Sequence, residues 1–142
     1  GRGDDIAHDV KALGAHVYID TNKQDAVEII KGLGGAQAIL STITDSIAVS
    51  ALIPALAPQG KLMVLGVGKE NLSLMPGLIV GREISVQGAI TGTPVELEKA
   101  LDFSLLADVR AMIETLPLEN ARQAWEKMRS GKAKFRMVLT VN

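Results

Sequence analysis

The chain contains no cysteine and only two histidines among its 142 residues. Without cysteine, disulfide bonds, thiolate nucleophiles and cysteine-ligated zinc are excluded for these residues. His8 lies beside Asp9 on a predicted helix and His16 begins a predicted strand, and neither has a second metal ligand at helical spacing. We expect both histidines at the surface, and we assign no catalytic residue and no metal ligand.

Long apolar runs and net charge are also scarce. The longest apolar stretches, Ile47–Leu56 and Leu72–Val80, are shorter than the ~20 residues that span a bilayer. The first residues lack the pattern of a secretory signal, so a cytoplasmic origin is the default expectation. The formal charge of −1, with acids and bases interspersed, provides no surface for nucleic acid. We therefore expect neither a membrane nor nucleic acid as a partner.

Aromatic residues make up 3% of the chain, so its core must be built from aliphatic side chains and methionine. Such a core is typical of parallel strands covered by helices. Short β-branched runs alternate with longer segments of helical period, which predicts a parallel α/β sheet with right-handed crossovers. Strands are expected at 16–19, 36–43, 61–67 and 84–90, and then, after a helix at 93–106, a different sheet with strands at 112–116 and 135–141.

Several element boundaries are marked by their residue types. Asp45 is expected to cap one helix, and Asn22 or Lys23 to begin another. Thr93 starts the sequence Thr-Pro-Val-Glu, which has the pattern of a capping box. The segment Ala57–Gly60 is expected to turn the chain into the following strand.

Open parallel sheets bind ligands beyond the carboxyl ends of their strands. Gly66, Gly68 and Gly92 lie just past predicted strands, where the missing Cβ lets the backbone approach a flat or charged ligand. The alternative is that these glycines only turn the chain. Gly32–Gly35 follows a helix rather than a strand, so we interpret it as a helix end and not as a phosphate-binding loop.

The segment Ser130–Arg136 is the most basic stretch of the chain. It is compatible with a solvated helix end, where positive charge is favourable. Arg136 differs from its neighbours, because a single arginine in an apolar strand favours an anionic partner such as a phosphate.

Several segments, in order along the chain, resemble the zinc-containing alcohol dehydrogenases of the medium-chain dehydrogenase/reductase family. The resemblance covers essentially the whole chain. It is carried by Leu13–Ala15, Ile19–Asp20, Leu56–Gly66, Gly81–Ala89, Leu116–Ala121 and Ser130–Thr140.

The resemblance implies an incomplete Rossmann-type, doubly wound parallel sheet. Residues 1–110 would form a partial NAD(P)-binding domain, and residues 111–142 would return to a catalytic domain. It implies an NAD(P)-dependent oxidoreductase that interconverts a small alcohol and an aldehyde or ketone. The family's zinc ligands and first dinucleotide-binding strands correspond to positions before Gly1, so the chain as written is expected to bind dinucleotide poorly and to catalyse nothing.

The same resemblance assigns cofactor contacts. Arg2 falls where an acidic residue usually binds the ribose of NAD, which favours NADP slightly because a guanidinium pairs well with a 2′-phosphate. Arg136 would contact the pyrophosphate. The residues expected to line the nicotinamide and its ribose are Thr42, Ile43, Thr44, Leu65, Gly66, Val67, Ala89, Ile90 and Thr91.

Two other readings remain open. One is a zinc-free quinone or enoyl reductase of the same superfamily, and the other is a non-catalytic α/β dimerisation module. Family members often pair through an edge strand, so we expect a homo-oligomer that uses the segment Ile84–Ile90.

Overall fold

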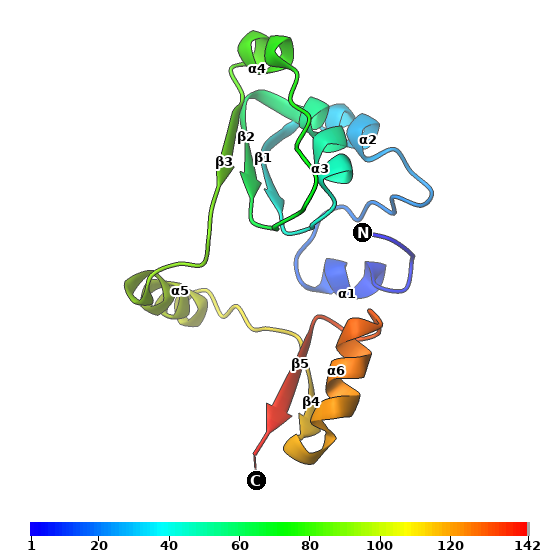
Figure 1. Ribbon diagram of the computed structural model, residues 1–142, viewed down its shortest axis with the longest axis vertical. Helices are drawn as coiled ribbons and strands as arrows, with labels where there is room; N and C mark the ends of the chain where they lie inside the picture. Colours follow the sequence, from blue (N-terminus) through cyan, green and yellow to red (C-terminus); the bar gives the residue numbers. More distant parts are fainter. Residues whose placement is uncertain (142) are drawn as a thin grey trace. The chain divides into compact units, whose positions relative to one another are not determined.

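The computed structural model describes residues 1–141, in which short helices alternate with strands (Figure 1). The chain divides into two compact units, Gly1–Thr91 and Gly92–Asn142. The expected boundary after residue 110 is a different division, since it marks where the chain would leave the NAD(P)-binding domain and return to a catalytic domain. It stays a prediction. No helix among the described residues is both long and apolar enough to cross a membrane.

The first unit contains a three-stranded parallel sheet in the order β1-β2-β3. Helices connect the strands, which confirms the predicted parallel α/β fold. Figure 1 shows α2 and α3 beside the sheet, where they contact each other. The elements of this unit are α1 (Ala7–Ala12), α2 (Ala26–Gly32), β1 (Ala36–Ser41), α3 (Ser46–Leu52), the 3-10 helix η1 (Ile53–Ala55), β2 (Leu56–Val64), α4 (Pro76–Arg82) and β3 (Ser85–Gly88).

One face of this sheet forms the core of the unit. Leu62 of β2 is fully buried, and Ile39 of β1 and Val86 of β3 pack beside it. The side chains of α3 and η1 complete the cluster from above this face. On the opposite face, Leu40 of β1 is 70% exposed. Parallel sheets are ordinarily covered on both faces, so the described residues leave this face uncovered at Leu40.

Helix starts follow short carboxylates. Asp45 caps α3 as predicted, and its side chain accepts hydrogen bonds from two backbone amides of the first turn. The predicted start of α2 at Asn22 or Lys23 is wrong, because Asp25 caps that helix in the same way. Asn22 and Lys23 belong instead to a turn whose amides point at Asp20.

Two other predictions about the first unit need correction. The segment His16–Ile19 is not a strand, because no neighbouring strand pairs with it in the described residues. The predicted turn Ala57–Gly60 lies inside β2. There it forms an irregularity, in which the register moves from Ala36 opposite Leu56 to Ala38 opposite Lys61. Gln59 accommodates the extra residues with a φ of 60°.

The second unit begins with α5 (Pro94–Leu106), where Thr93 and Glu96 form the predicted capping box. Its two strands pair in parallel as a separate sheet, which confirms the expectation that they leave the first one. On α6 the guanidinium of Arg129 lies 5.2 Å from the ring centre of Trp125, which is half exposed. The remaining elements are β4 (Ile113–Pro117), the 3-10 helix η2 (Leu118–Asn120), α6 (Ala121–Arg129) and β5 (Arg136–Thr140).

Candidate ligand-binding cleft

The first unit has an open cleft of about 970 Å³ where the carboxyl ends of its three strands meet. Its size lies within the range of small-molecule and cofactor sites. It is lined by Ile43, Ser46, Val49, Val64, Leu65, Gly66, Val67, Gly68, Glu70, Asn71, Leu72, Gly88, Ala89, Ile90 and Thr91.

Backbone hydrogen bonds hold the three strand ends together beyond the strands themselves. The amides of Leu65 and Gly66 donate to the carbonyl of Ser41, at 2.8 and 3.1 Å. The amide of Ala89 donates to the carbonyl of Val64 at 3.0 Å. The segments that follow β1, β2 and β3 therefore form one continuous backbone surface on the cleft.

Gly66 and Gly68 have no room for a side chain because the backbone after β1 packs against them. A Cβ on Gly66 would overlap the carbonyl oxygen of Ile43 and would lie 2.8 Å from that of Thr42. A Cβ on Gly68 would lie 2.5 Å from the carbonyl oxygen of Thr44. Neither glycine has a positive φ. Both glycines therefore let two backbone segments approach each other closely. From the sequence, the expected roles of these glycines are a close approach to a ligand or a turn of the chain.

Most of the residues predicted at the strand ends do meet in this cleft. Of the nine residues predicted to contact the nicotinamide and its ribose, seven line it: Ile43, Leu65, Gly66, Val67, Ala89, Ile90 and Thr91. Gly68 lines it as well, and Gly92 does not. Thr42 and Thr44 are not among the lining residues, and their carbonyls contact the two glycines instead. Val67 and Ile90 are 89% and 91% exposed, so the cleft contains apolar residues that are open to solvent.

Sequence reasoning missed the wall formed by Glu70, Asn71 and Leu72, and it missed Ser46. The signal for Ser46 was present, since it follows the predicted cap Asp45 directly after a strand end. The wall residues belong to a loop without regular pattern, so no periodicity marks them.

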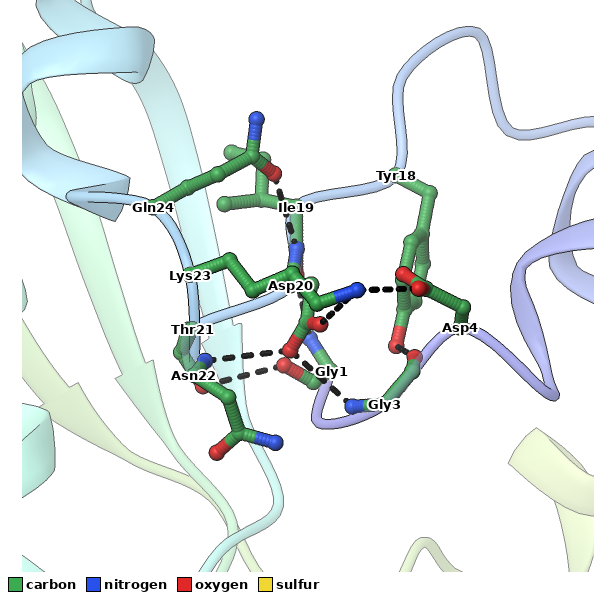
Figure 2. A network of polar contacts seen from close by, with 10 residues as sticks. All are labelled: Gly1, Gly3, Asp4, Tyr18, Ile19, Asp20, Thr21, Asn22, Lys23 and Gln24. Atoms are coloured by element: carbon green, nitrogen blue, oxygen red, sulfur yellow. Dashed lines mark hydrogen bonds and ion pairs between the residues drawn. The ribbon is translucent and has the colours of Figure 1, made fainter.

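Arg2 lies in an N-terminal segment that a network around Asp20 holds in place (Figure 2). Asp20 is 3% exposed, and its Oδ1 accepts hydrogen bonds from the amides of Gly3 at 2.9 Å and Asn22 at 3.0 Å. The hydroxyl of Tyr18 donates to the carbonyl of Gly3 at 2.6 Å. The backbone on the C-terminal side of Arg2 is therefore fixed, although Arg2 does not line the cleft.

The environment of Asp20 stabilises its ionised form. The amide hydrogen bonds from Asn22 and Gly3, together with the nearby ammonium of Lys23, lower the pKa of Asp20 below its usual value. Lys23 also pairs with Asp4 and so links the N-terminal segment to the same turn.

Arg136 begins β5 in the second unit, where the residue is exposed. The turn before it is held by Glu114 of β4, which accepts hydrogen bonds from the amide of Lys134 at 2.6 Å and from the ammonium of Lys127. The predicted contact of Arg136 with a pyrophosphate stays a prediction.

Among the described residues, no group of three or more His, Cys, Asp or Glu side chains is arranged to hold a metal ion.

Comparison with known proteins gives consistent matches. A family model described as zinc-binding dehydrogenase matches residues 2–105. The chain is 36% identical over 141 residues to alcohol dehydrogenase notN of Aspergillus sp. (strain MF297-2), covering 99% of this chain and 41% of the relative. It is 33% identical over 130 residues to an alcohol dehydrogenase of Geobacillus stearothermophilus, covering 91% and 38%. The chain thus spans about two fifths of the length of these relatives.

Solved structures share the fold. The alcohol dehydrogenase of Aeropyrum pernix superposes with a TM-score of 0.86 at 22% identity, covering 99% of this chain and 41% of that one. The benzyl alcohol dehydrogenase of Acinetobacter calcoaceticus gives 0.88 at 17% identity, covering 100% and 41%. These likenesses confirm the predicted α/β fold class.

We expect Gly66→Ala to lower the free energy of unfolding by about 2 kcal/mol or more, because the new methyl group overlaps backbone that cannot move aside. Gly77→Ala is the matched control. It lies on α4 with open space around it, so alanine should raise stability by up to ~1 kcal/mol. Urea unfolding of both variants checks this, and equal stability of the two would contradict the close contact.

Asp20→Asn should lower stability at neutral pH and make it less sensitive to acid. Because the folded pKa of Asp20 lies below the unfolded one, its stabilisation is complete above about pH 4 and declines as pH falls through the folded pKa. The difference in free energy of unfolding between wild type and variant should therefore shrink from pH 7 to pH 3, measured by urea unfolding. A difference that stays constant would contradict this role of the carboxylate.

Proposed function

The chain belongs to the zinc-binding dehydrogenase family, and from that premise we propose that it is the cofactor-binding portion of an NAD(P)-linked alcohol dehydrogenase. The reaction would be hydride transfer between an alcohol and an aldehyde or ketone. The observation that carries the proposal is the cleft at the carboxyl ends of three parallel strands, the place where open α/β sheets bind dinucleotides.

The cleft residues fit a nicotinamide ring and its ribose. Val67 and Ile90 offer apolar contacts to the faces of a planar ring. The backbone amides and carbonyls of the strand ends can hydrogen-bond to a carboxamide and to ribose hydroxyls. When bound, the nicotinamide supplies the hydride chemistry. The chain's own part is to hold the ring in one orientation and to exclude water from one of its faces.

Two arginines provide the proposed phosphate contacts. Arg136 would bind the pyrophosphate, because a guanidinium forms paired hydrogen bonds with phosphate oxygens. Arg2 would bind a 2′-phosphate and so favour NADP over NAD. The hydrogen bond from the amide of Gly3 to the carboxylate of Asp20 supports a defined backbone position next to Arg2.

Zinc does not fit the described residues, which contain no group able to hold it. We propose that zinc, if the protein uses it, is bound by residues outside this sequence.

A zinc-free quinone or enoyl reductase is the alternative within the superfamily. A cytoplasmic location stays a prediction.

The protein expressed from its complete gene should bind reduced dinucleotide and oxidise alcohols, monitored by nicotinamide fluorescence and by absorbance at the nicotinamide band. Arg136→Ala should weaken binding about tenfold or more, through loss of a charge-assisted contact. Arg122→Ala is the matched control, since Arg122 is exposed on α6 and pairs with Glu126.

Absence of dinucleotide binding would contradict the proposal and favour a non-catalytic module. The alternative reductase would be favoured if the protein binds dinucleotide but elemental analysis finds no zinc. Its activity should then be limited to quinones or enoyl substrates. NADPH bound more tightly than NADH, with the preference lost in Arg2→Ala, would establish the expected cofactor.

We further propose a homo-oligomer that uses the edge of β3. This strand is at the edge of its sheet, and its outer hydrogen-bonding groups have no strand partner in the described residues. Such an edge can pair with the same edge of a second copy. Light scattering at micromolar concentration should give a multiple of the monomer mass, and a monomer at that concentration would count against this interface.

A further inference from the structure

One wall of the cleft is a loop between β2 and α4. Glu70, Asn71 and Leu72 of this loop line the cleft. The loop contains no helix or strand, and within the described part of the chain its residues 69–74 make no backbone-to-backbone hydrogen bonds. Something other than secondary structure must therefore hold this wall in place.

Two serines of α3 tether the wall through its backbone. The hydroxyl of Ser46 donates to the carbonyl of Glu70 at 2.8 Å. The hydroxyl of Ser50 accepts from the amide of Ser73 at 2.9 Å. The two serines are four residues apart on the helix, so they lie on the same face and reach successive parts of the loop.

The serine pair is also connected within itself. The hydroxyl of Ser50 donates to the carbonyl of Ser46 at 2.7 Å. This bond uses the only hydrogen of the Ser50 hydroxyl and leaves its lone pairs for the amide of Ser73. The Ser50 hydroxyl can therefore only accept a hydrogen bond from the loop. A side chain without an acceptor at position 50 would leave the amide of Ser73 without this hydrogen bond.

Ser46 also connects the wall to the segments that follow the strands. Ser46 is 7% exposed, and a Cβ on Gly68 would come within 2.7 Å of its hydroxyl. Ser46 follows Asp45, the cap of α3, which in turn follows the segment after β1. Leu72, between the two tethers, packs against the buried core. The helix therefore connects the loop wall to the segments that follow β1 and β2.

We propose that Ser46 and Ser50 are positioning residues that set the width of the dinucleotide cleft by holding the loop from Glu70 to Ser73. The inference rests on the proposed function for the identity of the ligand. It does not rest on it for the tether, which is a property of the fold. Ser50 gives the sharper test because it does not line the cleft, so any effect of its loss on a ligand must pass through the loop.

Ser50→Ala in the protein expressed from its complete gene should speed hydrogen exchange of the Ser73 amide, measured by mass spectrometry of peptides that cover the loop. The Kd and KM for the dinucleotide should rise about threefold to tenfold, the range expected for one hydrogen bond, with kcat unchanged. Ser50→Thr, which keeps the hydroxyl, should restore both values.

Ser104→Ala is the matched control. Ser104 makes the same kind of bond to the carbonyl four residues earlier on α5, at 2.7 Å, but tethers no loop. Its loss should leave dinucleotide binding unchanged. If Ser50→Ala does not fold, Ser50→Cys takes its place, because a thiol keeps the shape of the side chain but forms weaker hydrogen bonds.

The outcomes separate this inference from the proposed function. Unchanged exchange at Ser73 in the variant would overturn the tether, whatever the protein binds. Faster exchange with dinucleotide binding equal to that of Ser104→Ala would overturn the positioning role. A wild-type protein that binds no dinucleotide would refute the proposed function, and with it the role of the tether in cofactor binding.

Discussion

The cleft depends on a contact between two stretches of backbone that leaves no space for a side chain. Gly66 lies against the carbonyls that follow β1, and its amide donates to the last residue of that strand. Any side chain at this position would separate the ends of β1 and β2. The carboxyl ends of the strands would then no longer form a single surface, and the residues after β3 would lose their neighbour. The serine tethers on α3 join the loop wall to the same arrangement.

The sequence predicted the parts of this structure that depend on local chemistry. Asp45 and Thr93 were identified as helix caps because a short acceptor followed by helical periodicity has one common use. The strand ends were predicted at the points where continuous apolar runs stop. Seven of the nine residues predicted there to contact the nicotinamide and its ribose line the cleft, although their contact with a cofactor remains a proposal.

The failures have a common physical cause, which is the dependence of a segment on partners far away in sequence. The run His16–Ile19 has the composition of a strand, yet a strand exists only where a neighbour supplies hydrogen bonds. The turn at Ala57–Gly60 became an irregularity of β2 because pairing with β1 continued across it. The loop wall could not be predicted at all, since side chains of α3 hold it and no repeating pattern marks it.

The scarcity of aromatic residues gives the second unit its own optical reporter. Trp125, the single tryptophan of the chain, lies on α6 beneath the guanidinium of Arg129, and it belongs to the second unit. Tyr18, the single tyrosine, donates its phenol hydrogen to Gly3 within the first unit. Within these residues, indole emission therefore follows the C-terminal unit alone, because the phenol lies in the other unit. The melting of the C-terminal half can be recorded by this emission without attaching a dye.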